Sequence, residues 1–289
     1  MTSQGLSVDR GQDTRLRSDN LSKRNFDRLA RFINGYSGIR MPPTKVTMLE
    51  GRLRRRLRVT GHASLDSYCH FLFDEDGIES EAVHLIDVAT TNKTDFFREP
   101  NHFAYLVENV LPAMMHRDKG EVRVWSAACS TGAEPYTLAM ILEDFRQSYR
   151  LGYSILATDL STEVLSTAVR GIYPEEMMDP VPPDMARKYV LRSVRGDRQV
   201  RIHHSLRSKI GFARLNLMDD SYAIGAPVDV IFCRNVLIYF EKKVQEAVLS
   251  RLCDCLAPNG YLFIGHSESI GGFSLPVKQV ANTIFQKTR

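Results

Sequence analysis

The fold of this chain is decided by the stretch Val122-Arg-Val-Trp-Ser-Ala-Ala-Cys-Ser-Thr-Gly-Ala-Glu-Pro-Tyr-Thr-Leu-Ala-Met-Ile-Leu142. It predicts a short strand over residues 122–125, a tight loop of small residues over 126–132, and a helix that opens near Glu134-Pro135. A strand, a small-residue loop and a helix form the first half of a mononucleotide-binding crevice, where the backbone comes close to a ligand. The stretch therefore predicts an α/β fold with a nucleotide-type site at the end of this strand.

The residues of this loop limit the kinds of ligand that it can bind. Gly132 is its only glycine, so the G-x-G-x-x-G fingerprint of pyrophosphate binding is absent. This favours an adenosine ligand without a pyrophosphate, and S-adenosylmethionine is the obvious candidate. The next predicted strand, 154–158, runs into Asp159, where an acid can accept hydrogen bonds from ribose hydroxyls. An acid at a strand end is also a common helix N-cap, but its position after this loop favours the ribose role.

Composition sets the class of protein. A chain of 289 residues suits one full α/β domain and a smaller one, since domains commonly run about 100–200 residues. No apolar run approaches the roughly 18 residues of a membrane span. The five cysteines lack C-x-x-C spacing, which favours reduced thiols in the cytoplasm. Residues 1–20 lack the apolar core of a secretory signal and are expected to be a disordered tail.

Two hydrophobic periodicities divide the rest of the chain. Residues 21–92 predict an all-helical N-terminal domain with helices over 21–35, 45–59, 64–73 and 79–90. Within the second domain, residues 93–289, the expected strands are 122–125, 154–158, 209–213, 228–233 and 260–265, and the expected helices are 134–147, 161–169 and 241–256. Their alternation predicts a mostly parallel sheet covered on both faces, with an antiparallel edge hairpin within residues 272–287.

One segment is longer than a βα connection of about 2–6 residues requires. Residues 188–194 and 199–204, joined by a turn over 195–198, predict an antiparallel hairpin. We take residues from about 174 to 207 as a small β insertion on the main sheet. Surface insertions of this kind often carry partner recognition.

A run of arginines stands out from the modest net charge of +4. Leu49, Leu53 and Leu57 line one face of a predicted helix, and arginines cover the rest. The helix is either a solvated surface with arginine stems lying along it or a docking surface for nucleic acid or an acidic protein helix. The candidate docking residues are Arg52, Arg54, Arg55, Arg56 and Arg58.

Four motifs follow one another along the chain. They are Thr90-Thr-Asn-Lys-Thr-Asp-Phe-Phe-Arg-Glu99, Trp125-Ser-Ala-Ala-Cys-Ser-Thr-Gly-Ala-Glu-Pro-Tyr136, Ile231-Phe-Cys-Arg-Asn-Val-Leu-Ile-Tyr-Phe240 and Phe263-Ile-Gly-His-Ser-Glu268. Together and in this order they resemble the chemotaxis receptor methyltransferases of the CheR type. The resemblance runs from about residue 22 to the C-terminus. It implies a Rossmann-like class I methyltransferase sheet preceded by an all-helical domain. It also implies a cytoplasmic enzyme that transfers a methyl group from S-adenosylmethionine to receptor glutamates, leaving S-adenosylhomocysteine.

The resemblance also implies site residues. Those assigned to the cofactor are Asn92, Thr94, Arg98, Glu134, Asp159, Asn216, Leu217, Arg234 and Asn235. Arg98 would pair with the methionine carboxylate, Glu134 with the ammonium group and Asp159 with the ribose. Tyr239 would stand near the transferring methyl, so Arg98 and Tyr239 are the catalytic candidates. Asn235 and Tyr239 would share a face if the chain turned helical after Arg234.

The implied chemistry needs little acid–base work. A sulfonium methyl is already activated, and a carboxylate ionised at neutral pH is already a nucleophile. We therefore expect in-line positioning and exclusion of water, with no metal. His266 and Trp125 are expected to be structural, and Cys129 replaces an alanine without becoming a nucleophile.

Two other functions compete with this interpretation. A nucleic-acid amino methylase would usually show an Asn/Asp-Pro-Pro-Tyr/Phe loop after the fourth strand, whereas residues 234–239 contain no proline. A non-catalytic adapter would not need Arg98, Asp159, Asn235 and Tyr239.

The expected partner is the cytoplasmic helical bundle of chemoreceptors, docked on residues 21–92. Nucleic acid binding and membrane insertion are not expected, and the protein is expected to be a monomer. The sequence leaves open whether the β insertion also binds a receptor C-terminal peptide.

Overall fold

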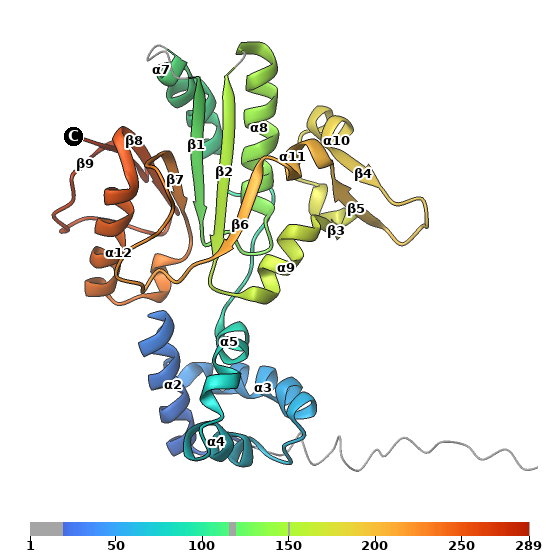
Figure 1. Ribbon diagram of the computed structural model, residues 1–289, viewed down its shortest axis with the longest axis vertical. Coiled ribbons are helices and arrows are strands. Elements are labelled where there is room, and N and C mark those ends of the chain that lie inside the picture. Colours follow the sequence, from blue (N-terminus) through green and yellow to red (C-terminus); the bar gives the residue numbers. More distant parts are fainter. Residues whose placement is uncertain (1–19, 116–119, 150, 289) are drawn as a thin grey trace, which may run out of the picture. The chain divides into compact units, whose positions relative to one another are not determined.

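The computed structural model describes residues 20–115, 120–149 and 151–288 (Figure 1). The chain divides into two compact units between Thr90 and Thr91. The tail expected over residues 1–20 lies outside the described residues, apart from Asn20. Among the described residues, no helix combines the length and apolar composition needed to cross a bilayer.

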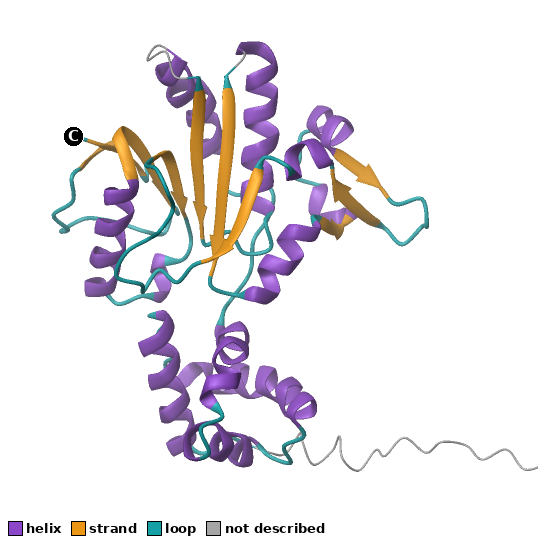
Figure 2. Ribbon diagram, viewed as in Figure 1, coloured by secondary structure: helices purple, strands orange, loops and turns teal. Residues whose placement is uncertain are grey.

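The first unit is all-helical over its described residues (Figure 2). Its helices are α2 Lys23–Ser37, η1 Pro43–Lys45, α3 Val46–Thr60, α4 Leu65–Asp74 and α5 Ile78–Ala89. The side chain of Ser22 caps the start of α2, and Gly38 ends it with φ 73°. Leu49, Leu53 and Leu57 of α3 are at most 1% exposed, so helical spacing buries this apolar face. The expected all-helical domain is confirmed.

The second unit is built on a seven-stranded sheet in the order β6-β2-β1-β7-β8-β10-β9. Its strands are β1 Glu121–Ala127, β2 Gly152–Asp159, β6 Ile210–Arg214, β7 Val228–Cys233, β8 Leu256–Ile264, β9 Val277–Ala281 and β10 Ile284–Lys287. The first five in spatial order pair in parallel, whereas β10 is antiparallel to both β8 and β9. The predicted mostly parallel sheet with an antiparallel hairpin at its edge is confirmed.

Helices connect the parallel strands, with α8 Ala133–Tyr149 after β1, α9 Thr162–Arg170 after β2 and α12 Lys242–Cys255 after β7. Right-handed crossovers leave β1 and β7 in opposite directions, which places α8 and α12 on opposite faces. A further helical run was not predicted, namely α6 Pro100–Tyr105, η2 Leu106–Val110 and α7 Leu111–Met115. Phe103 of α6 stacks on Phe232 of β7 with ring centroids 5.8 Å apart, so this run also covers the sheet.

The β insertion is a separate three-stranded sheet in the order β3-β5-β4. Its elements are β3 Ile172–Pro174, η3 Glu175–Met178, α10 Pro183–Tyr189, β4 Val190–Arg192, β5 Gln199–Ile202 and α11 His204–Arg207. The expected hairpin is present as β4 and β5. Its first strand is shorter than predicted, because Lys188 and Tyr189 belong to α10. Lys188 Nζ and Tyr189 Oη donate to Asp144 Oδ1 of α8 at 3.0 and 2.6 Å. These two bonds fix the end of α10.

Candidate functional site

The candidate site lies at the point where the strand order reverses. The chain leaves β1 for β2 and β6 on one side and later returns to β7 and β8 on the other. In open α/β sheets, ligands bind beyond the carboxyl ends of the strands at such a switch point. Non-glycine residues with positive φ concentrate in the segments that meet here, at Phe97, Glu99, Ala128, Ser130 and Asn235. Strained backbone of this kind is typical of functional sites.

The loop after β1 is fixed from two directions. Cys129 N donates to Thr158 O of β2 at 2.9 Å, and Ser130 Oγ donates to Asn92 O at 2.9 Å. The Cys129 side chain is buried, and burial raises the pKa of its thiol well above the usual value. A protonated, enclosed thiol is unreactive, as its assignment outside the chemistry requires.

Gly132 is required by packing within the protein. Its φ is 95°, and a Cβ there would lie 2.9 Å from both Ala168 Cβ and Tyr173 Oη. Tyr173 Oη also donates to Thr131 O at 2.6 Å. The glycine thus lets α9 and the β insertion approach the loop.

Asp159 is the last residue of β2, as predicted. Its Oδ2 accepts from Ser130 N at 2.8 Å and its Oδ1 from Ser161 N at 3.0 Å. The N-cap of α9 is Ser161, whose side chain accepts from Val164 N, so Asp159 is not that cap. A carboxylate offers about four acceptor positions, so its chemistry suits ribose hydroxyls in addition to the loop.

Asn216 and Leu217 lie directly beyond β6, at the same edge of the sheet as Asp159. Leu215 N donates to Asp159 O at 3.0 Å, which ties the two strand ends together. Asn216 Oδ1 accepts from Met218 N at 3.0 Å, and the Leu217 side chain is buried. The structure therefore brings this pair close to Asp159.

Arg234 is the centre of a buried ionic network. Its side chain is 2% exposed, its Nε donates to Glu134 Oε2 at 2.7 Å, and its Nη1 donates to Arg98 O at 2.7 Å and lies 3.3 Å from Glu99 Oε2. Glu134 Oε1 accepts from Ser126 Oγ at 2.6 Å. Arg234 thus holds together the ends of β1 and β7 and the segment before α6. Glu134, which the resemblance assigns to the cofactor's ammonium group, has Arg234 as a cationic partner.

Glu99, His102 and His266 bring donor atoms within 4.8 Å of one another, a grouping that could hold a metal ion. However, Arg234 Nη1 lies 3.1 Å from His102 Nδ1 and 3.3 Å from Glu99 Oε2, so a guanidinium occupies the cationic position. Burial, followed by the charge of Arg234, lowers the pKa of His102 to about 4. Burial by itself would raise the pKa of Glu99, but the hydrogen bond from Asn235 and the Arg234 charge outweigh it and lower that pKa.

The depressed pKa of His102 predicts acid-sensitive stability. The unfolded chain binds this proton near pH 6.5 and the folded chain only near pH 4, so the free energy of unfolding should fall as pH drops through this window. Between pH 7 and pH 5 the loss should reach up to about 2 kcal/mol. Urea unfolding at pH 7 and pH 5 tests this. The free energy of unfolding of His102→Asn should fall less between these two pH values than that of the wild type. Equal losses in the two proteins would contradict the assignment.

Asn235 and Tyr239 lie in an irregular turn after β7. The expectation that they share a helical face is wrong, because Asn235 has φ 58° and only a short 3₁₀ turn, η4 Leu237–Tyr239, follows it. A left-handed residue interrupts helical periodicity. Asn235 Nδ2 donates to Glu99 Oε1 at 3.1 Å, and Tyr239 N donates to Val236 O at 3.1 Å.

The segment over residues 92–98 runs beside the β1 loop. Asn92 and Thr94 are half-buried, and Phe97 N donates to Thr137 Oγ1 of α8 at 3.1 Å. The Arg98 guanidinium donates to a backbone carbonyl of the same segment at 3.1 Å. All nine cofactor candidates and Tyr239 therefore belong to the segments that converge beyond β1, β2, β6 and β7.

The docking candidates on α3 fall into three groups. Arg54 is half-buried and lies 3.9 Å from the Glu50 carboxylate of the same helix. Arg52 donates to backbone carbonyls near the end of α5, and Arg56 makes two 2.6 Å hydrogen bonds with the Glu81 carboxylate. These two arginines hold α3 against α5. The exposed members are Arg55 and Arg58.

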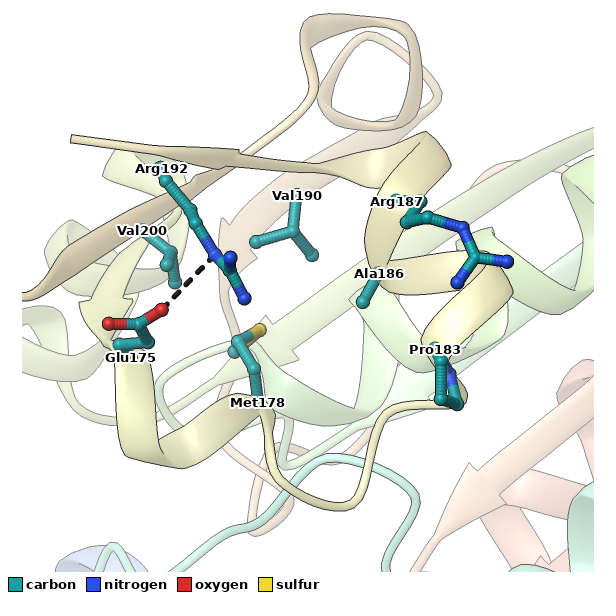
Figure 3. A pocket seen from close by; sticks show the side chains of 8 residues that line it. All are labelled: Glu175, Met178, Pro183, Ala186, Arg187, Val190, Arg192 and Val200. Carbon is teal, nitrogen blue, oxygen red and sulfur yellow. Dashed lines mark ion pairs between the residues drawn. The ribbon is translucent and has the colours of Figure 1, made fainter. Parts of the chain in front are cut away.

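The β insertion carries a separate hollow of about 360 Å³ (Figure 3). Its lining residues are Glu175, Met178, Pro183, Ala186, Arg187, Val190, Arg192 and Val200. Arg192 pairs with Glu175 at 3.1 Å beside the apolar side chains. The neighbouring strand β4 is an edge strand, and its Leu191 side chain is 51% exposed.

Two acids of the site were missed by the sequence argument, although both stand inside the quoted motifs. Glu99 bonds to Asn235 and Arg234, and Glu268 accepts four backbone hydrogen bonds near the end of β7. Each is the acidic last residue of its motif, and this position could have marked it as part of the site.

Comparisons with known proteins agree with this architecture. Residues 24–90 match the family model described as CheR methyltransferase, all-alpha domain, and residues 92–285 match CheR methyltransferase, SAM binding domain. A chemotaxis protein methyltransferase of Borreliella burgdorferi is 37% identical over 88% of this chain and 90% of its own length. One from Escherichia coli is 39% identical over 86% of this chain and 85% of its own length. One from Salmonella typhimurium is 38% identical over 86% and 85%.

Proposed function

Because this chain belongs to the CheR methyltransferase family, we propose that it methylates glutamate side-chain carboxylates of chemoreceptors, forming methyl esters for sensory adaptation. It is a methyltransferase whose cofactor is S-adenosylmethionine, since most of the chain matches the family's SAM-binding domain. The proposed location is the cytoplasm, and the proposed partner is the helical bundle of the receptors.

The observation that carries this proposal is the convergence of Asp159, Arg234, Asn235 and the β1 loop at one switch point. The donor set fits the cofactor, because Asp159 supplies a carboxylate for the ribose. Leu217 supplies an apolar neighbour for the adenine, and Arg98 supplies a cation for the amino-acid carboxylate. The half-buried Asn92 and Thr94 extend this surface towards the methionine end.

The chemistry requires little from the protein beyond position. The bound cofactor supplies an activated methyl group, and the acceptor carboxylate is already ionised at neutral pH. The chain's own residues orient the two reactants and exclude water. Tyr239 holds the reacting centre, and Arg98 orients the cofactor and the incoming glutamate. Glu134 accepts a hydrogen bond from Arg234 and also pairs with the ammonium group of the cofactor.

Transfer of labelled methyl from S-adenosylmethionine to receptor-containing membranes tests this function. The label should appear on the receptor as a base-labile ester, and receptors whose methylation-region glutamates are changed to glutamine should accept none. Label in nucleic acid would favour the competing methylase. Absence of transfer, with intact cofactor binding, would favour a non-catalytic adapter.

We further propose that Arg55 and Arg58 contact the acidic receptor bundle. Both are exposed on α3, whereas Arg52 and Arg56 are half-buried and bind groups of α5 and the residue after it. Exposed charge pairs are individually weak, about 0–1 kcal/mol, but several charges together steer encounter and fix register.

Reversing both charges, in Arg55→Glu/Arg58→Glu, should raise the KM for receptor about tenfold and flatten its dependence on salt. Cofactor affinity should stay unchanged. The matched control is Lys243→Glu/Lys278→Glu, which changes the net charge equally at exposed positions of the second unit. If both double variants show the same KM, net charge alone is responsible and α3 is a solvated surface.

The β insertion is the proposed site for a receptor C-terminal peptide. The exposed edge of β4 suits an extended peptide that adds a strand, and the neighbouring apolar hollow suits one of its side chains. Receptors lacking their C-terminal tail should sediment less of this protein than full-length receptors. Equal co-sedimentation would exclude peptide recruitment.

A further inference from the structure

The Glu268 carboxylate is buried beside the turn that carries Tyr239. Its side-chain Oε1 accepts from Leu237 N at 2.7 Å and Ile238 N at 3.4 Å. Its Oε2 accepts from Asn235 N at 3.0 Å and Gly265 N at 2.6 Å. Three of the four donors belong to residues 235–238, so one carboxylate fixes the backbone immediately before Tyr239.

The loop after β8 is shaped to bring this carboxylate close. A Cβ at Gly265 would lie 2.5 Å from Asn235 Nδ2, 2.9 Å from Asn235 N and 2.9 Å from Glu268 Oε2. Asn235 is held in the left-handed region with φ 58°. Asparagine enters this region more readily than most residues, and the Glu268 carboxylate fixes it here by accepting from Asn235 N.

We propose that Glu268 is a positioning residue of the methyl transfer reaction, acting by holding the Asn235–Ile238 backbone so that Tyr239 meets the reacting centre. The inference rests on the proposed role of Tyr239. Glu268 touches neither cofactor nor substrate in this assignment. Its effect should appear mainly in kcat, with a smaller change in cofactor affinity through Asn235, which is itself assigned to the cofactor.

The carboxylate cannot be replaced by an amide without loss. Each oxygen accepts two N–H groups, so the NH₂ of Glu268→Gln would face two donors in either orientation. The turn should then shift, and misplacement by about 1 Å can cost up to about a hundredfold in rate.

A double-mutant cycle tests the inference. Single-turnover rates and cofactor Kd are measured for wild type, Glu268→Gln, Tyr239→Phe and the double variant. The matched control is Asp229→Asn, an equally buried carboxylate of β7 that accepts from Arg123 N at 2.9 Å, away from Tyr239. Unfolding midpoints are recorded for all five proteins.

Glu268→Gln should be at least about tenfold slower than Asp229→Asn, with a smaller change in cofactor Kd than in rate, since the turn also carries Asn235. The double variant should be no slower than the slower single variant, because both changes act through Tyr239. Multiplied losses, or a wild-type rate in Glu268→Gln while Tyr239→Phe is slow, would overturn the positioning role alone. A wild-type rate in Tyr239→Phe would remove both this inference and the proposed role of Tyr239.

If Glu268→Gln does not fold, Gly265→Ala keeps the inference testable. The added methyl would press on Asn235 and on the carboxylate while leaving the charge in place. Its single-turnover rate should fall in the same way, again without multiplying the loss of Tyr239→Phe. A folded Gly265→Ala protein with wild-type turnover would overturn the proposal.

Discussion

Arg234→Met should destabilise the methyltransferase unit by about 3–5 kcal/mol, because removing one partner leaves buried charges uncompensated. Arg234 is 2% exposed, and the side chains of Glu134 and Glu99 that it neutralises are only 10% and 13% exposed. Methionine fills a comparable volume but offers no donor to either carboxylate. The measurement is the urea dependence of unfolding, followed by a signal from the second unit.

Two further variants give this prediction its controls. Arg187→Met removes an ion pair with Asp184 in which the two side chains are 72% and 77% exposed, so its cost should stay within about 0–1 kcal/mol. Adding Glu134→Gln to Arg234→Met should recover part of the loss, since one uncompensated charge disappears. Stability equal to wild type in Arg234→Met would show that the network contributes nothing to the fold.

Asp159→Ala should weaken binding of S-adenosylmethionine by about 10- to 100-fold, through loss of charge-assisted hydrogen bonds worth about 1.5–3 kcal/mol. The same carboxylate accepts from Ser130 N and Ser161 N, so the alanine variant also releases the loop after β1. Calorimetric titration of the cofactor measures the combined effect.

Asp159→Asn separates the two contributions. The amide oxygen keeps one acceptor near the loop but carries no charge, so its cofactor affinity should lie between those of wild type and Asp159→Ala. Unfolding midpoints measured beside the titrations report any loosening of the loop. Unchanged affinity in both variants would remove Asp159 from the cofactor site.

The sheet was predictable because its strands carry strong local signals. The strand over 228–233 has the predicted bounds, and all six of its residues are buried, as expected of a central parallel strand. The last two residues of α10, Lys188 and Tyr189, were mistaken for strand because their neighbours are strand-like, while the contact that fixes them is with Asp144. Strand β3 is only three residues long, too short for a periodic signal.

The residues of the candidate site were easier to predict than the contacts between them. The bond from Arg234 to Glu134 spans 100 residues and that from Asn235 to Glu99 spans 136, so no local spacing indicates them. The left-handed conformation of Asn235 arises from such distant contacts, and it invalidated the helical-face argument for Tyr239. The functional roles of these residues stay predictions until the variants are measured.

The order β8-β10-β9 has a consequence for how the protein is made. Strand β10, Ile284–Lys287, is translated after every other strand, yet it lies between two of them. Until β10 is made, the nascent sheet therefore ends at β8, whose outer edge is unpaired. Strand β9 meanwhile has no neighbouring strand to pair with. During that interval an unpaired edge is exposed to other chains. The helical unit, with its local contacts, can fold far earlier, whereas the described sheet is completed only when this four-residue strand is inserted.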